Sequence, residues 1–197
     1  KVTYDFDKFS KEYMNTKIKE ANTLTNYMSQ TISDFQNFFK PQGKKESFSI
    51  VNACKEALFI LESSLTYHGI KVEFNVIKNS DVFGYKNEYS QVILNVLSNA
   101  KDILIERKID NPKINIEIKE GDNFAIVKIT DNGRGVEEKI LEKIFEPYFT
   151  TKHQTQGTGI GLYMSKNIIE RNMHGFINVS NHNKGACFTV KVLKKES

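Results

Sequence analysis

The sequence predicts an α+β fold in which helices cover one face of a mostly antiparallel sheet. Between residues 50 and 193, segments with helical hydrophobic spacing alternate with segments of strand-like spacing. Four strand-like segments form two pairs, 114–119 with 124–130 and 176–180 with 186–193, and a short turn-like stretch joins each pair. Strands joined in this way pair antiparallel, so most of the sheet is expected to be antiparallel.

One long helix is expected before this alternation, over residues 11–40. Its hydrophobic positions are spaced alternately by four and three residues, which is a heptad pattern. These positions are Met14, Ile18, Ala21, Thr25 (the only polar member), Met28, Ile32, Phe35 and Phe39. Such a helix can lie on its own domain or pair with other helices, and the length of the pattern favours pairing. Pro41 and Gly43 then end the helix, so we expect residues 1–45 and 46–197 to form separate domains.

The remaining helices and strands follow from the same spacing rules. The expected elements are helices at 50–67, 88–109, 137–145 and 160–171 and one further strand at 71–77. Gly69 and Pro112 mark the ends of two of the helices, and the polar stretches 120–123 and 181–185 supply the hairpin turns.

The composition is that of an ordinary globular protein, with 39% hydrophobic and 26% charged residues among 197. A net charge of +4 is too small to indicate nucleic-acid binding without clustering. The apolar stretches are only a few residues long, so no membrane contact is expected. Cys54 and Cys187 fit a reducing compartment, so we expect a cytoplasmic chain whose parent can carry a membrane anchor elsewhere. Because Lys1 is not Met, we expect a piece of a longer protein.

A narrow polar stripe runs along the predicted helix 88–109, beside its apolar face. Asn95, Asn99 and Asp102 follow one another at spacings of four and three, so their side chains share one side of the helix. They can be the solvated edge of an amphipathic helix or form a site at the edge of the core. Asn is unfavourable inside helices, so two of them one turn apart favour a site. An amide oxygen suits Mg²⁺, which keeps waters and substrate phosphates as its other ligands.

The first of two glycine-rich segments, Asp-Asn-Gly-Arg-Gly at residues 131–135, follows the predicted strand 124–130. Asn-Gly is a common hairpin turn, but a carboxylate at a strand end beside glycines can also hold a flat ligand close to the backbone. Asp131 is able to accept a hydrogen bond from the exocyclic amine of adenine. Guanine has a carbonyl group at that position and would be rejected.

The second glycine-rich segment, Gly-Thr-Gly-Ile-Gly-Leu at residues 157–162, opens the predicted helix 160–171. Successive glycine N–H groups at a helix start favour an anion such as phosphate. The segment is not a P-loop, because no Gly-Lys-Ser/Thr follows, nor a dinucleotide fingerprint, because Leu162 replaces the third glycine. Between the two segments, residues 145–152 end in Thr-Thr-Lys, which suits phosphate, although Lys152 can equally belong to an ordinary solvated loop.

Taken in order, these four segments resemble the N, G1, F and G2 boxes of the catalytic ATP-binding domain of bacterial sensor histidine kinases, in the GHKL superfamily. The resemblance covers roughly residues 46–193. It implies the Bergerat fold, a two-layer α/β sandwich with a mixed, mostly antiparallel sheet and helices on one face. It also implies ATP and Mg²⁺ as cofactors.

The same resemblance implies roles for individual residues. Asn99 would be the Mg²⁺ ligand, with Asn95 and Asp102 beside it, and Asp131 would hold the adenine amine. Lys152 would contact the terminal phosphate, and Asn95 and Lys152 are the residues expected to act in catalysis. The other expected ATP-binding residues are Gly133, Gly135, Tyr148, Thr151, Gly157, Thr158, Gly159, Ile160, Gly161, Leu162 and Thr189.

The helix at 11–40 resembles the second helix of the dimerisation and phosphotransfer hairpin of these kinases. This implies a homodimer through the hairpin, a histidine-bearing helix of the same parent protein as phosphoacceptor, and a response regulator as a further partner. None of the chain's own histidines precedes an acidic residue, as the acceptor usually does; they are His68, His153, His174 and His182. We therefore expect the acceptor to precede Lys1.

The residue four positions before the metal-binding asparagine separates members of the superfamily. Hydrolytic members resemble one another in having Glu there, as general base toward water. This chain has Asn95, whose amide cannot take a proton, which favours transfer of the γ-phosphoryl group to a protein over fast hydrolysis. Two alternatives stay open: an ATPase of the same fold, with Glu106 or Asp102 as base, and a non-catalytic nucleotide-sensing dimerisation module.

Overall fold

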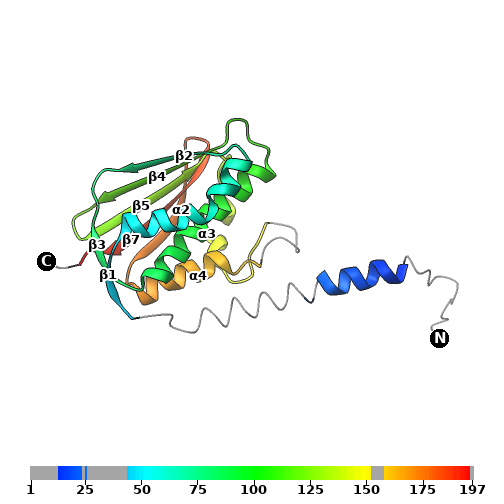
Figure 1. Cartoon of the computed structure of the whole chain (residues 1–197), viewed down its shortest axis with the longest axis horizontal. Helices are drawn as coiled ribbons and strands as arrows, with labels where there is room; N and C mark the ends of the chain where they lie inside the picture. The colour runs from blue at the N-terminus through cyan, green and yellow to red at the C-terminus, as the bar shows by residue number, and fades with distance from the viewer. Residues whose placement is uncertain (1–12, 24, 26–43, 152–157, 196–197) are drawn as a thin grey trace. The chain divides into compact units, whose positions relative to one another are not determined.

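The structure is a computed structural model that describes residues 13–23, 25, 44–151 and 158–195 (Figure 1). The chain divides into two compact units, Lys1–Pro41 with Thr150–Thr158, and Gln42–Phe149 with Gly159–Ser197. We describe each unit by itself and call the second one the sandwich.

The first unit contains helical residues 13–23 and 25. The Thr25 hydroxyl donates to the Ala21 carbonyl oxygen over 2.9 Å. Two heptad residues of this segment, Met14 and Ile18, are 44% and 53% exposed. The rest of the helix predicted at residues 11–40 lies outside the described residues.

The sandwich is built on a five-stranded sheet with the order β2-β4-β5-β7-β6. The strands are β2 (Lys71–Val76), β4 (Lys113–Glu120), β5 (Phe124–Asp131), β6 (Phe176–His182) and β7 (Gly185–Leu193). β2 pairs parallel with β4, and the other neighbouring pairs are antiparallel. The predicted mixed, mostly antiparallel sheet is therefore confirmed, as are both predicted hairpins.

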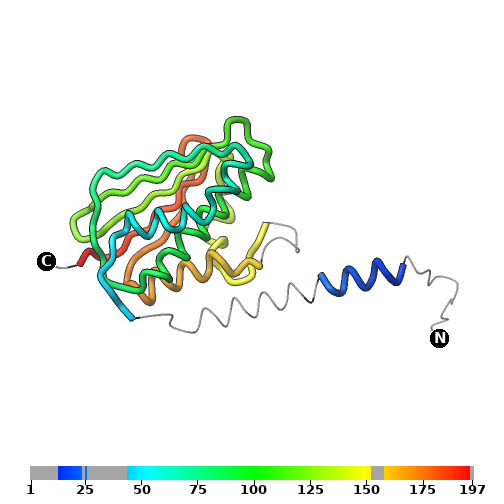
Figure 2. The backbone as a smooth tube through the Cα atoms, viewed as in Figure 1, coloured from blue at the N-terminus to red at the C-terminus, as the bar shows by residue number. Residues whose placement is uncertain are grey.

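Three helices cover one face of this sheet, as both the ribbon and the tube show (Figures 1 and 2). They are α2 (Ile50–Tyr67), α3 (Lys86–Glu106) and α4 (Gly161–Asn167). Buried and partly exposed side chains alternate along the strands, and the buried ones pack against the helices. In β4 the buried residues are Ile114, Ile116 and Ile118. The hydrophobic core lies between these two layers, and the opposite face of the sheet is polar.

A separate two-stranded sheet, absent from the sequence prediction, joins β1 (Glu46–Ser49) antiparallel to β3 (Asp81–Gly84). With four residues each, these strands are too short to show an alternating pattern. β1 runs directly into α2, since the last residue of β1, Ser49, is also the N-cap of the helix. Its hydroxyl accepts from the Asn52 N–H over 3.3 Å.

Two predicted helices differ from the structure. The helix predicted at 137–145 is wrong, because the chain forms two short 3₁₀ turns, η2 (Glu138–Ile140) and η3 (Lys143–Phe145). Glu146 is already extended, at φ −75° and ψ 146°, because the following Pro147 disfavours helical backbone there. The helix predicted at 160–171 begins as α4 and then widens into the π-helical turn η4 (Ile168–Asn172).

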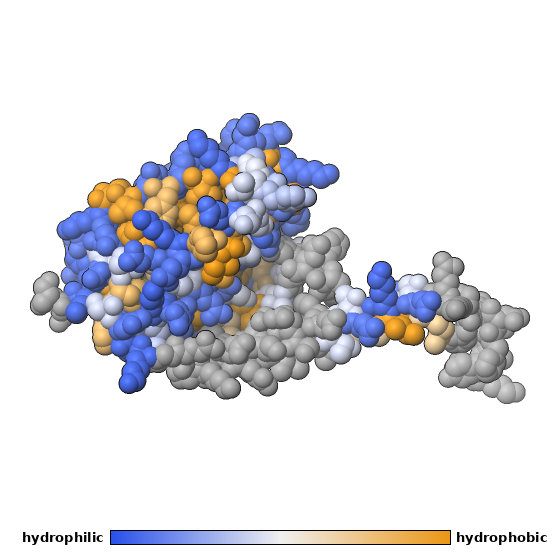
Figure 3. Space-filling view, viewed as in Figure 1, coloured by the Kyte–Doolittle hydropathy of each residue, from blue (hydrophilic) through white to orange (hydrophobic). Residues whose placement is uncertain are grey.

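The surface over α2 mixes polar and apolar side chains (Figure 3). On that helix Phe59 and Ile60 are 76% and 65% exposed. Within the described part of the chain, no helix is both long enough and apolar enough to cross a membrane.

Candidate functional site

Helix α3 forms one wall of the candidate site. Asn95, Asn99 and Ile103 lie one turn apart on the same side of this helix. At 1.5 Å per residue, Asn95 and Ile103 are about 12 Å apart along the helix axis. One glycine-rich segment contacts each of these two residues, so α3 sets the separation between the two segments.

The Asn95 end of the site includes the start of α4. The Asn95 side-chain amide donates to the Gly161 carbonyl oxygen and to the Ser165 hydroxyl, in both cases over 3.4 Å. The buried Ser165 hydroxyl donates to the same carbonyl oxygen over 3.0 Å. These bonds connect the first turn of α4 to the side chain of Asn95.

The Ile103 end of the site is formed by Gly133 and Asp131, the last residue of β5. A Cβ atom on Gly133 would lie 2.5 Å from Ile103 Cγ2 and 2.9 Å from Asp131 Oδ1, so only glycine fits there. The Gly133 N–H donates to Asp131 Oδ1 over 2.7 Å, and the Ala186 N–H donates to the same oxygen over 3.3 Å. Because both bonds end on Oδ1, they leave the other carboxylate oxygen able to accept from a ligand.

The electrostatics of Asp131 suit such a role. Its side chain is only 6% exposed, and burial raises the pKa of its carboxyl group above the usual value. The N–H groups of Gly133 and Ala186, and then the charge of Arg107, partly oppose this rise in pKa. A buried carboxylate with incomplete compensation is typical of a functional site rather than of a structural ion pair.

Arg107 holds the loop 132–136 from the helix side. It is the C-cap residue of α3, one turn after Ile103. Its guanidinium Nη1 donates to the carbonyl oxygens of Gly133 and Gly135, the latter over 2.9 Å. Arg107 is not among the residues predicted from the sequence, because the loop that it holds is remote along the chain.

Two asparagines hold the same loop from the sheet side. Asn132 Oδ1 accepts from the Lys113 N–H over 2.9 Å, at the start of β4. Asn181, near the end of β6, accepts from the Val136 N–H over 2.8 Å and donates to the Val136 carbonyl oxygen over 2.7 Å. A Cβ atom on Gly135 would collide with the Asn181 side chain, which gives that glycine a packing role.

A third contact joins the predicted F and G2 segments. A Cβ atom on Gly159 would lie 2.5 Å and 2.7 Å from the carbonyl carbon and oxygen of Tyr148, and 2.8 Å from Phe149 N. Gly159 and Tyr148 both have left-handed backbone, with φ of 66° and 65°. The Gly159 backbone therefore lies directly against the peptide bond between Tyr148 and Phe149, and Tyr148 as a residue is 69% exposed.

Most of the predicted site residues lie along this wall. Asn95 and Gly161 meet at one end of the wall, and Asp131 and Gly133 lie at the other end, beside Ile103. Asn99 lies between the two ends, one helical turn from Asn95 and one from Ile103. Gly135 follows in the loop held by Arg107, Gly159 contacts Tyr148, and Ile160 and Leu162 flank Gly161 at the start of α4.

Asp102 lies one turn after Asn99 on α3, and the remaining predicted residues that the structure describes are placed elsewhere. The Asp102 carboxylate forms an ion pair with Lys101 Nζ, over 3.3 Å. Thr151 and Thr158 belong to the first unit. Lys152 and Gly157 lie outside the described residues.

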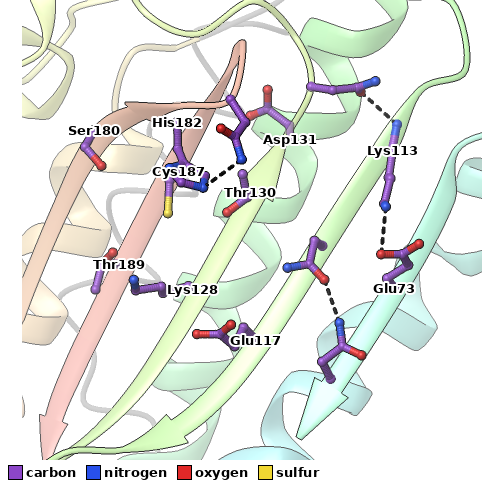
Figure 4. Close-up of a pocket in the computed structure, with 14 residues that line it drawn as sticks. Glu73, Lys113, Glu117, Lys128, Thr130, Asp131, Ser180, His182, Cys187 and Thr189 are labelled. Atoms are coloured by element: carbon purple, nitrogen blue, oxygen red, sulfur yellow. Dashed lines mark hydrogen bonds and ion pairs between the residues drawn. The ribbon is translucent and has the colours of Figure 1, made fainter. Parts of the chain in front are cut away.

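Thr189 is placed on the polar face of the sheet, opposite the helices. It lines a hollow of about 600 Å³ there, and Figure 4 shows it beside Lys128, its partner in the β5–β7 ladder. Side chains alternate along β7, so Phe188 is buried while Thr189 faces the hollow. The β7 residue that contacts Asp131 is Ala186, through its backbone N–H. Asp131 also lines this hollow, but Thr189 lies on the face of the sheet away from the helices and is not brought together with Asn95 and Asn99 of α3.

The residue types along α3 fit a nucleotide with a divalent cation. Asp131 can accept from an amine on a flat ring, and the close approach of Gly133 leaves no side chain between that ring and the backbone. Within residues 13–23, 25, 44–151 and 158–195, no three His, Cys, Asp or Glu side chains cluster to hold a metal ion. A cation at Asn99 would depend on the amide oxygen, water and phosphate oxygens, which is a ligand set that Mg²⁺ accepts.

Comparison with known proteins agrees with this geometry. Residues 84–196 match the family model described as histidine kinase-, DNA gyrase B-, and HSP90-like ATPase. The chain is 30% identical to the two-component sensor PprA of Pseudomonas aeruginosa, covering 92% of this chain and 20% of that protein. It is 34% identical to sporulation kinase A of Bacillus subtilis, covering 83% of this chain and 27% of that protein. The chain thus spans about a quarter or less of these curated relatives.

Among solved structures, the nucleotide-free catalytic domain of histidine kinase ThkA is similar, with a TM-score of 0.69 and 29% identity. The similarity covers 77% of this chain and 97% of the ThkA domain. The part of the chain that matches is therefore comparable to one whole catalytic domain.

Proposed function

The chain belongs to the family of histidine kinase-, DNA gyrase B- and HSP90-like ATPases, and we propose that it is the ATP- and Mg²⁺-binding catalytic domain of a protein-histidine kinase. It transfers the γ-phosphoryl group of ATP to a histidine outside this chain, as a step of two-component signal transduction. The similar proteins named as a two-component sensor, a sporulation kinase and a histidine kinase support this choice within the family.

One observation carries the proposal. The buried carboxylate of Asp131 lies beside Gly133 at one end of a stretch of α3 whose other end, at Asn95, contacts the second glycine segment. Asn99 lies between the two ends. A nucleotide has its base and its phosphates at opposite ends, so this order supports a base site at Asp131 and a phosphate and metal site toward Asn95 and Asn99.

The proposed roles follow from the chemistry of the side chains. Bound ATP supplies the phosphoryl group, and Mg²⁺ offsets the charge of the phosphates. Asp131 accepts from the adenine amine and so prefers adenine to guanine. Asn99 gives its amide oxygen to the cation, Gly159 and Gly161 face the phosphates with backbone N–H groups, and Lys152 contacts the terminal phosphate.

Asn95 supports phosphoryl transfer rather than hydrolysis. Its amide has no basic lone pair with which to activate water, and its N–H donates to the Gly161 carbonyl oxygen. In this proposal Asn95 orients the phosphate-facing turn, and the acceptor histidine replaces water as the nucleophile.

The heptad helix supports the proposed partners. Met14 and Ile18 are exposed apolar residues on one side of the first unit's helix. We infer that this side pairs with a histidine-bearing helix of the same parent protein and with a second copy, forming a cytoplasmic helical bundle. A response regulator then receives the phosphoryl group from the histidine.

Labelled ATP tests the proposal directly. The chain should not label itself, but in the presence of Mg²⁺ it should label a separately supplied hairpin from the parent protein that carries the acceptor histidine. An Asn99→Ala variant should lose this activity, and Gln91→Ala, an exposed position on the same helix, should retain it. Stable label on the chain alone, or rapid release of phosphate to water without label on the hairpin, would contradict the proposal.

A further inference from the structure

The loop 132–136 leaves the regular ladder of the sheet immediately after Asp131. Arg134 and Gly135 both have left-handed backbone, with φ of 71° each. One backbone bond, from the Arg134 N–H to the Lys184 carbonyl oxygen over 2.8 Å, connects the loop to the β6–β7 turn. The carbonyl groups of Gly133 and Gly135 face the C-terminal end of α3 instead, where the backbone N–H groups are already bonded to carbonyl groups of the helix itself.

Arg107 supplies the missing donor. Its guanidinium is planar and carries several N–H groups, so it can hold two carbonyl oxygens at once. It accordingly donates to both Gly133 and Gly135 and joins the loop to the last turn of α3. A cation at the C-terminal end of a helix is also favoured by the helix dipole, which helps to keep the side chain in this place.

The contact matters because Gly133 has little freedom on its other sides. It lies against Ile103 of α3 and donates its N–H to Asp131 Oδ1. A shift of Gly133 away from α3 would therefore change both the direction of the Asp131 carboxylate and the space beside Ile103. On the far side of the loop, the two side-chain hydrogen bonds of Asn181 go to Val136 rather than to Gly133.

We propose that Arg107 is a positioning residue for the nucleotide base: by holding the carbonyl groups of Gly133 and Gly135 against α3, it sets the position from which Asp131 recognises the exocyclic amine. This inference rests on the proposed function, because it assigns a determinant of base selectivity to the same site. Arg107 itself does not contact the base. Its charge also favours the ionised form of Asp131, which is the form that accepts from an amine.

The proposal differs from a role of Arg107 as a helix cap alone. A helix cap would contribute to the stability of the fold, and its loss would weaken the binding of every nucleotide equally. A positioning residue affects most strongly the ligand whose base makes the recognised contact. ATP and inosine triphosphate separate the two roles, because they share ribose and phosphates and differ at the exocyclic position that Asp131 would recognise.

Calorimetric binding of both nucleotides, with Mg²⁺ present, tests the inference. Arg107→Ala should raise the Kd for ATP about tenfold, as expected for the loss of a charged hydrogen bond. The Kd for inosine triphosphate should change much less, so the preference for ATP should fall. Arg171→Ala removes the same charge from an exposed position on η4 and should leave both Kd values unchanged.

Arg107→Lys keeps the charge at the end of α3 but lacks the planar fork, so it serves as a second variant that retains the cap. It should keep the thermal unfolding midpoint near that of the wild type and lose part of the preference for ATP. If either variant bound both nucleotides more weakly by the same factor, so that the preference for ATP stayed unchanged, the inference would be overturned and Arg107 would be a cap alone. Failure of the wild-type chain to bind ATP would instead overturn the proposed function.

Discussion

Asn95 of α3 donates its side-chain amide to the backbone carbonyl oxygen of Gly161, the first residue of α4, over 3.4 Å. The same amide also reaches the buried hydroxyl of Ser165, one turn further along α4. The position at which the resemblance implies a general base in hydrolytic members of the superfamily thus carries a hydrogen-bond donor here. That donor orders the glycine-rich turn at the start of α4.

Asn95→Ala should loosen this turn. The variant removes the donor and leaves the Gly161 carbonyl oxygen with the Ser165 hydroxyl as its side-chain donor. We expect a loss of about 1 kcal/mol in the free energy of unfolding, from a long and partly buried hydrogen bond. ATP affinity should fall by about threefold to tenfold in calorimetry. Gln91→Ala, at an exposed position one turn earlier on the same side of α3, is the control, and equal behaviour of the two variants would refute the role of Asn95.

Asp131→Asn should separate binding from stability. The amide oxygen can still accept from Gly133 and Ala186, but the amide group cannot accept from an adenine amine as a carboxylate does. ATP affinity should fall by about tenfold to a hundredfold in calorimetry. Asp122→Asn, in the exposed turn between β4 and β5, should bind ATP like the wild type. Undiminished ATP binding by Asp131→Asn would exclude the adenine assignment.

The same variant should alter the pH dependence of folding. Burial raises the pKa of Asp131 in the folded state, so its ionised form costs stability above that pKa. Without nucleotide, Asp131→Asn should therefore unfold at a higher temperature than the wild type at neutral pH. This advantage should shrink as the pH falls through the raised pKa toward the ordinary aspartate value of 3.8, and it should be absent below 3.8, where the carboxyl group is protonated in both states. A lower unfolding temperature at neutral pH would contradict the assigned effect of burial.

Gly159→Ala should reduce the free energy of unfolding by more than the strain of a left-handed alanine alone. Gly159 and Gly69 have nearly the same φ, 66° and 64°, so an alanine at either position adds strain of about 1 kcal/mol. Nothing lies within 4 Å of a Cβ at Gly69, whereas a Cβ at Gly159 would meet the Tyr148 peptide group. Urea unfolding should show a larger loss of stability for Gly159→Ala than for Gly69→Ala. The contact between Gly159 and Tyr148 would have no energetic weight if the two losses were the same.

Glu120→Gln should weaken the domain in a pH-dependent way. Hydrogen bonds from Lys194, at 2.8 Å, and from Lys78 lower the pKa of Glu120 from 4.5 to about 2. The lowered value means that these ion pairs stabilise the fold above pH 4.5 and lose this effect as the pH falls through about 2. Thermal unfolding should therefore show a variant that is less stable at pH 7 and equal to the wild type near pH 2. Glu62→Gln, on the exposed side of α2, should show no such trend.

The heptad helix should make the chain self-associate. Ile18→Glu places a charge in the apolar seam, whereas Thr23→Glu adds the same charge on the outer side of the helix. Analytical ultracentrifugation should find concentration-dependent dimers for the wild type and for Thr23→Glu, and monomers for Ile18→Glu. A wild-type chain that stays monomeric at all concentrations would rule out this interface.

Local patterns predicted much of the sandwich. The alternation of Ile114, Ile116 and Ile118 with polar residues defined β4, and the two glycine segments lay at both ends of the functional stretch of α3. The strands β1 and β3 were too short to show a period, and Pro147 prevented the helix that apolar spacing suggested before it.

The residues that hold the site were harder to predict, because their partners are distant in the sequence. Arg107 acts on Gly135, and Asn181 acts on Val136, through contacts that exist only after the sheet and α3 have packed. Whether Thr189 faces the helices or the opposite side of the sheet depends on the exact register of β7. Ala186 contributes its backbone N–H, and a motif of side chains does not reveal a backbone contact.

The contact between Gly159 and the Tyr148 peptide group has a practical consequence for protein engineering. It brings together the two ends of the segment 150–158, so the length of that segment is not needed to keep its ends in place. Lengthening a closed loop costs only about 0.6 kcal/mol for each doubling. A reporter sequence inserted into this segment would interrupt the proposed phosphate contacts of Thr151 and Lys152, whereas the wall formed by α3 does not depend on the length of the segment.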